Sequence, residues 1–70
     1  MKSLKEICKS NEKAYEWFAN GGDLSTKLYL ELYEYYVSNG EMPYGVAKAR
    51  TGDPLQWIMD RLEKDMEIHE

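Results

Sequence analysis

Residues 24–37 read LSTKLYLELYEYYV, and this stretch decides the fold. On a helix, with about 100° of rotation per residue, one face is made of four apolar or aromatic side chains: Leu24, Leu28, Leu32 and Tyr35. Further tyrosines continue around from that face, and only Lys27, Glu31 and Glu34 form a narrow polar strip. A helix that is apolar nearly all round is usually buried on several sides. We therefore expect a helix over about residues 24–38 that is the hub of an all-α fold.

A β-hairpin is the competing interpretation of the same stretch. Its leucines alternate with other residues, it is rich in tyrosine, and the Asn-Gly pair at 39–40 is a strong hairpin turn signal. The strands would lie near 28–37 and 42–47. The helix is favoured because leucine and glutamate prefer helices and the glycine after the stretch is a natural C-cap. Pro43 and Gly45 weaken the second strand.

The residues before the hub predict one helix over about 3–20. Ser3 and Glu6 are spaced as a capping box, and apolar residues recur after them at helical spacing. The glycines that follow Asn20 supply a left-handed C-cap. Asn11 falls inside the apolar stripe, where we expect it to mark the edge of the stripe against water. The alternative is that its amide fixes the register or binds a backbone group.

Two further helices are predicted after the hub. A short one covers about 43–51, with proline in its first turn and glycine after its end. The last covers about 53–67, because Asp53 is a preferred capping residue and Pro54 suits the first helical position. The chain is thus predicted to be a single domain over residues 1–70, a small bundle of three longer helices and one short helix. The core is expected to contain Leu4, Ile7, Cys8, Phe18, Leu24, Leu28, Leu32, Val46, Leu55, Ile58, Leu62 and Met66.

Composition restricts the chemistry. The 70 residues include one cysteine and one histidine, so neither an internal disulfide nor a closed zinc site of such ligands can form. Cys8 lies on an apolar stripe, where thiols are commonly inert, and His69 has no evident acid or base partner. We therefore predict no enzymatic activity, no cofactor and no metal. The lone thiol fits a reducing compartment, and the absence of a long apolar run or a leader favours a cytoplasmic protein away from membranes.

The negative charge is concentrated in the last helix. The net charge is −4, and residues 53–70 hold six acidic and two basic groups. Asp60, Glu63 and Glu67 are spaced three and four apart, so they would share one helix face. Such a row can imitate a phosphate backbone to a basic groove, although a charged face more often only keeps a protein soluble.

Aromatic residues are unusually frequent, with nine in the chain. Trp17 and Trp57 lie off the core stripes of their helices, and Tyr29 and Tyr33 lie at the flank of the hub. Arg61 is one turn beyond Trp57 on the same side. Tyrosine, tryptophan and arginine are the residue types that anchor protein interfaces. The alternative is that these rings seal the edges of a small core.

These features predict a small acidic protein-interaction module. It would act as a regulator, adaptor or inhibitor of another macromolecule, through the aromatic anchors and the acidic helix face. Proteins encoded by phages and mobile elements are often of this size. The expected partner is a protein, and a second copy of the chain is one alternative.

A DNA-binding helix-turn-helix over residues 46–62 is the second functional interpretation. A short helix, a glycine turn and a capped helix follow one another there. Lys48, Arg50 and Thr51 could contact phosphates. The second helix, however, carries more acidic than basic side chains, and it would meet the phosphates with its own negative charge. Nucleic acid is therefore the less favoured partner.

Overall fold

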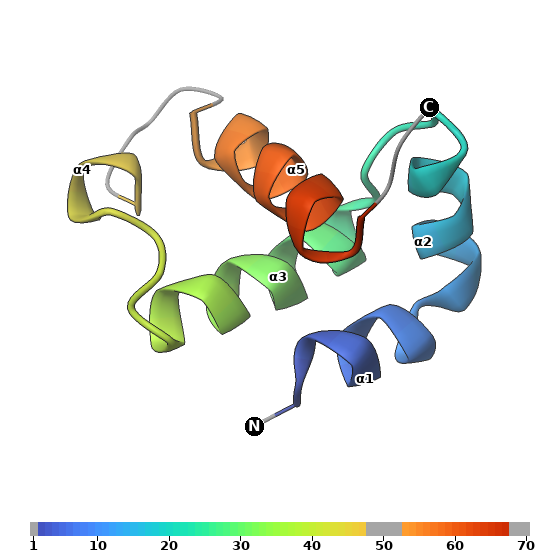
Figure 1. Ribbon diagram of the computed structural model, residues 1–70, viewed down its shortest axis with the longest axis horizontal. Helices are drawn as coiled ribbons and strands as arrows, with labels where there is room; N and C mark the ends of the chain where they lie inside the picture. Colours follow the sequence, from blue (N-terminus) through green and yellow to red (C-terminus); the bar gives the residue numbers. More distant parts are fainter. Residues whose placement is uncertain (1, 48–52, 68–70) are drawn as a thin grey trace.

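Helices account for most of the chain in the computed structural model, which describes residues 2–47 and 53–67 (Figure 1). These residues form helices, turns and connections, with no strand among them. The all-α fold predicted from the sequence is therefore confirmed, and the alternative hairpin over 28–47 is wrong. The helices are α1 (Leu4–Ser10), α2 (Glu12–Ala19), α3 (Thr26–Ser38), α4 (Tyr44–Ala47) and α5 (Asp53–Asp65).

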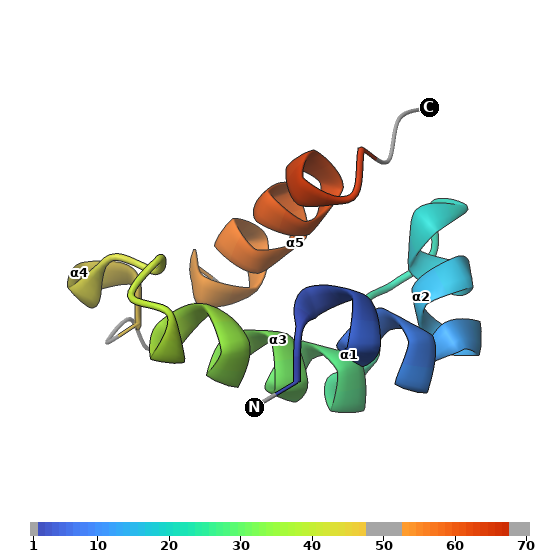
Figure 2. The same cartoon turned by 60° about the horizontal axis from the view of Figure 1, so that its bottom comes forward.

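Helix α3 is the hub, as predicted. It begins after Ser25, whose hydroxyl accepts a hydrogen bond from the backbone N–H of Leu28 at 3.2 Å. It ends at Ser38, and Gly40 then adopts a positive φ of 69°, the left-handed conformation that glycine adopts without strain. In Figures 1 and 2, α1 and α5 both lie against α3. Each of the two therefore uses α3 as its packing surface.

The predicted helix over 3–20 is divided into α1 and α2 at Asn11. This residue has φ −120° and ψ 41°, and its side-chain amide donates to the carbonyl of Ile7 at 2.9 Å. Asparagine breaks helices in this way because its short amide competes with backbone groups for the same partners. Asn11 is only 8% exposed, so the expectation that it marks the edge against water is wrong. The alternative, that it binds a backbone group, is confirmed.

The core lies between α3, α1 and α5 and agrees with most of the predicted set. Seven of the predicted side chains are buried: Ile7, Cys8, Phe18, Leu28, Leu32, Ile58 and Leu62. Four others pack against that core while partly exposed: Leu4, Leu24, Val46 and Met66. The prediction that Leu55 belongs to the core is wrong, since its side chain is 38% exposed. Pro54 takes the buried position at the start of α5 instead. Sequence reasoning missed Tyr36 and Met42, both buried.

The last two helices have the predicted order with different bounds. Helix α5 begins at Asp53, as the Asp-Pro pair indicates. It ends at Asp65, two residues before the predicted end, and Glu67 has a positive φ of 53°. Helix α4 spans Tyr44–Ala47, and the remainder of the predicted short helix, 48–51, lies outside the described residues. No helix in the described ranges is long and apolar enough to cross a bilayer.

Candidate functional site

Three of the predicted contact residues meet on one side of α5. Trp57, Asp60 and Arg61, together with Lys64, line a shallow hollow of about 190 Å³. Their spacing of three and four residues places them on one helix face. The predicted grouping of Trp57 with Arg61 and a neighbouring carboxylate is therefore present in the structure, in a hollow too small and open for a buried ligand.

The Trp57 ring also belongs to the packing between α5 and α3. It is half-buried and meets the fully buried Tyr36 edge to face, with ring centroids 5.3 Å apart and planes at 82°. This arrangement is among those that aromatic pairs favour. Part of the Trp57 ring thus covers the edge of the core, which is the alternative that the sequence left open, and the rest faces the hollow.

Arg61 is held by two carboxylates. Its Nη2 lies 2.7 Å from Oε1 of Glu41 and its Nε lies 3.1 Å from Oδ2 of Asp65. The same Asp65 oxygen accepts a hydrogen bond from the Tyr36 hydroxyl at 3.0 Å. Burial, and then this bond to a carboxylate, raise the pKa of Tyr36 well above its usual range. Since these contacts join α5 to the end of α3, Arg61 has a structural role beside any role in binding.

The predicted acidic row on α5 is shorter than expected. Asp60 and Glu63 are exposed on the helix, and Asp60 accepts a hydrogen bond from the Gln56 side chain at 2.9 Å. Glu67 lies beyond the end of the helix, in the left-handed conformation. The expectation that three carboxylates share one helix face is therefore wrong at Glu67, because the helix ends before that residue.

The outer face of α3 carries an apolar strip that faces solvent. Leu30 is 58% exposed and Val37 is 42% exposed. They are seven residues apart, which is two turns, so they share a face. Tyr29 and Tyr33 are half-buried at the edge of this face, with ring centroids 6.1 Å apart and planes tilted by 53°. We name Tyr29, Leu30, Tyr33 and Val37 the outer strip.

Sequence reasoning named only the tyrosines of the outer strip as contact residues. The sequence feature that could have indicated Leu30 and Val37 is the breadth of the apolar surface of this helix. A helix that is apolar nearly all round either is enclosed by its own chain or leaves one side for a partner. In the described structure α1 and α5 cover two sides of α3, and in Figure 2 no helix runs beneath it.

Trp17 is the remaining predicted anchor, on α2. It is 54% exposed, the largest exposed ring of the described residues, as its position off the core stripe predicts. Its indole lies over Gly22, where a Cβ atom would collide with the ring. The Gly22 N–H also donates to the Trp17 carbonyl at 2.8 Å. The glycine therefore allows the chain to turn closely around the tryptophan.

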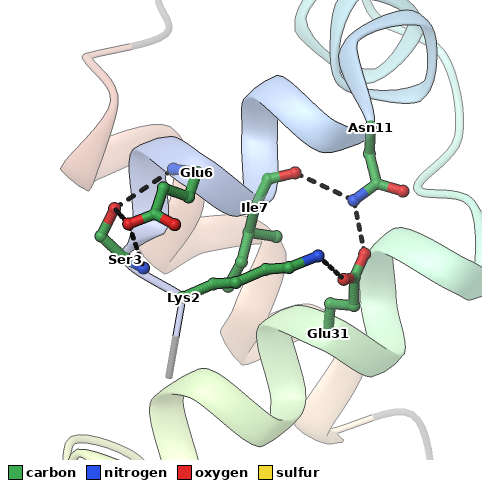
Figure 3. Close-up of polar contacts among 6 residues, drawn as sticks. All are labelled: Lys2, Ser3, Glu6, Ile7, Asn11 and Glu31. Carbon is green, nitrogen blue, oxygen red and sulfur yellow. Dashed lines mark hydrogen bonds and ion pairs between the residues drawn. The ribbon is translucent and has the colours of Figure 1, made fainter.

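A polar cluster closes the seam between α1 and α3 (Figure 3). The Glu31 carboxylate accepts a hydrogen bond from the Asn11 amide and pairs with the Lys2 ammonium at 3.3 Å. The bond from Asn11, and then the lysine contacts, lower the pKa of Glu31. A depression of about 230 Å³ lies along this seam. Glu34 also lines this depression. Because Asn11, Glu31 and Lys2 bind one another across the seam, these three residues act as a clasp between the helices.

The other candidate chemistry is limited in the described part of the chain. Cys8 is buried, and burial raises the pKa of its thiol, which disfavours the reactive thiolate. Across residues 2–47 and 53–67, no three His, Cys, Asp or Glu side chains are grouped as metal ligands. The predicted phosphate contacts Lys48, Arg50 and Thr51 lie outside the described residues, so the helix-turn-helix interpretation stays a prediction.

Comparisons with known proteins add no relative. No protein-family model, no curated protein and no solved structure matches this chain.

Proposed function

We propose that this chain is a protein-binding module whose main contact surface is the outer strip of α3. It would act as a regulator, adaptor or inhibitor of the partner that it binds. The observation that carries the proposal is the exposure of Leu30 and Val37, at 58% and 42%, on the helix that is otherwise the most enclosed in the fold. Single exposed aliphatic residues are ordinary. Two on one face, beside a pair of tyrosine rings, form a contiguous patch.

The composition of the strip supports binding to a protein. Tyrosines bring a large contact area with few rotatable bonds and a hydroxyl that stays hydrogen-bonded when covered. Fully covering a leucine or valine side chain is worth about 1.5–3 kcal/mol, and the exposed fraction of each is still available for that gain. The outer strip therefore offers favourable free energy on contact with an apolar surface.

Exposed carboxylates supply the acidic flank of the proposal. Glu34 lies beside the strip on α3, and Asp60 and Glu63 lie on α5. Such charges mainly set the rate of encounter with an oppositely charged partner and contribute less to its retention. The hollow beside Trp57 is a second, smaller contact area. The unpaired, buried Cys8 fits the reducing compartment in which we propose that the module works.

The test is photo-crosslinking in the cells that make the protein. A benzophenone amino acid replaces Leu30 in one variant and Leu55 in the control, because Leu55 is also an exposed leucine, on α5. We expect position 30 to give one dominant protein adduct, which Val37→Ser removes, and position 55 to give little. Equal adducts from both positions, or none from position 30, would contradict a binding role for the outer strip.

A further inference from the structure

The outer strip is bordered on one edge by two charges of opposite sign. Lys27 and Glu34 are seven residues apart, so they lie on the same edge two turns from each other. Both are exposed. Neither forms an ion pair with another residue in the described ranges, although Lys27 is close enough to Glu31 to help lower the pKa of that carboxyl. The edge thus presents a positive site near the start of α3 and a negative site near its end.

This pattern is complementary to itself when the helix is reversed. In a twofold-symmetric pair of antiparallel helices, each residue of one copy faces a residue of the other at the opposite end. Lys27 of each copy would then face Glu34 of its partner, and Leu30 would pack near Tyr33 at the centre. A parallel pair related by a twofold axis along the helices would instead place this edge of each copy against the opposite edge of the other, so Lys27 and Glu34 would not meet.

We infer that the occupant of the outer strip is a second copy of this chain, paired antiparallel along α3. The inference rests on the proposed function, since it names the partner for the same surface. The pair is weak, because one strip of a 13-residue helix is smaller than the roughly 800 Å² per partner of a standard interface. A dissociation constant on the order of 100 µM fits an interface of this kind.

Pairing along the outer strip leaves the opposite side of α3 unchanged. Helix α5 packs on the inner face, so the hollow of Trp57, Asp60, Arg61 and Lys64 stays open on each copy. The dimer would therefore present two identical α5 faces, as a bivalent adaptor does.

The first experiment is a concentration series by sedimentation velocity on the full chain, from about 10 µM to 1 mM, a range that brackets the expected dissociation constant. We expect reversible dimers in the parent and at least a tenfold loss of association in Leu30→Ser. Leu55→Ser, the matched control on α5, should associate like the parent. A chain that stays monomeric throughout, or a dimer that Leu30→Ser does not weaken, would overturn the inference.

The second experiment uses charge reversal and mixing. Lys27→Glu alone places glutamates at both sites of each edge, and Glu34→Lys alone places lysines at both, so each variant should dimerise more weakly than the parent. An equimolar mixture of the two restores both opposite-charge contacts and should form heterodimers. A chain carrying both reversals should dimerise like the parent. Mixing that gives no recovery would show that these two residues do not meet across the interface.

The mass of the adduct from the photo-crosslinking at position 30 separates the two proposals. An adduct of twice the chain's mass supports both. An adduct with a different protein, from a chain that stays monomeric in solution, leaves the proposed function standing and rejects the second copy. An absence of adducts at position 30 rejects both.

Discussion

The two faces of α3 carry the same residue types, but one face is buried in the core and the other is exposed to solvent. On the inner face Leu28, Leu32 and Tyr36 are fully buried, while on the outer face Leu30 and Val37 keep about half of their surface exposed. All belong to one uninterrupted helix. The difference shows that hydrophobic composition decides that this helix becomes the hub, whereas the docking of neighbouring helices decides which of its side chains stabilise the fold and which remain for a partner.

The two seams on α3 also differ in kind. Beside its buried apolar side chains, α1 is joined to it by the polar clasp of Asn11 with Glu31, whereas α5 is joined by the ring contact of Tyr36 with Trp57 and by the hydrogen bond of Tyr36 to Asp65. An apolar or aromatic seam gains from burial itself, whereas a polar seam gains little net free energy but loses much when one partner is removed. Substitutions on the different sides of α3 should therefore reduce the free energy of unfolding by different amounts.

The largest effect is expected at the inner face. Leu32→Ala removes a fully buried side chain from the centre of the core and should reduce the free energy of unfolding by about 2–5 kcal/mol. Chemical denaturation followed by circular dichroism measures this loss. Since small domains have little stability to spare, partial unfolding at 37 °C should accompany it. A variant that unfolds at the same denaturant concentration as the parent would contradict the core assignment.

The second largest effect on stability is expected at Trp57, and a much smaller one at Trp17. Trp57→Ala loses the ring contact with Tyr36 and should cost about 2 kcal/mol, less than for a fully buried ring. Trp17→Ala, at a ring that is 54% exposed, should change stability by less than about 0.5 kcal/mol. Fluorescence provides the independent measurement. With Trp17 replaced by phenylalanine, Trp57 should be partly protected from iodide, and full quenching would contradict its packing on α3.

The third largest effect on stability is expected at the polar clasp of Asn11 with Glu31. Asn11→Ala removes the amide that binds both Ile7 and Glu31, and it should reduce the free energy of unfolding by about 1–2 kcal/mol. The contribution of Glu31 is present when this carboxyl is ionised. Because the fold lowers its pKa, that contribution should be lost as the pH falls through the folded-state pKa. The difference in stability between the parent and Asn11→Ala should therefore narrow in acid, where the bond to the Ile7 carbonyl remains, and a constant difference across the titration would contradict the clasp.

Alkaline pH tests the aromatic seam. The fold raises the pKa of Tyr36 by burial and by the bond to Asp65, so its contribution is complete below the unfolded value of about 10. Above that pH the unfolded chain ionises first, and stability should fall by up to about 1.4 kcal/mol per pH unit. Tyr36→Phe should cost about 1 kcal/mol at neutral pH and lack this loss. Denaturation at pH 8 and pH 11 compares the two chains, and equal slopes would show that Tyr36 does not titrate with folding.

Elements encoded by adjacent residues were predictable from the sequence. The capping box of Ser3 and Glu6 and the start of α5 at Asp53 are both present in the structure, because each requires only residues within one helical turn. The identity of α3 as the hub was equally local, since it follows from the breadth of its own apolar surface.

Features that depend on distant residues were not predictable in the same way. The break at Asn11 is fixed partly by Glu31, 20 residues later, and the burial of Tyr36 depends on the docking of α5. For the candidate site, the grouping of Trp57 with Arg61 on one side of the last helix was predicted from helical spacing, but the exposure of Leu30 and Val37 was not. Their exposure depends on where α1 and α5 pack around α3, and helical periodicity alone contains no such information.

The smallest stability effect is expected at the outer face, where the functional effect should be the largest. Leu30→Ala deletes a side chain that is 58% exposed, so the free energy of unfolding should change by no more than about 0.5 kcal/mol. The matched control variant, Leu32→Ala, makes the same chemical change two residues away on the inner face. The adduct formed by a benzophenone residue at position 37, a second position in the outer strip, should nevertheless decrease strongly in Leu30→Ala, because the strip loses its most exposed aliphatic contact. If Leu30→Ala instead destabilises the chain as much as Leu32→Ala, then Leu30 is a core residue, the two faces of α3 are equivalent, and the outer strip is not a binding surface.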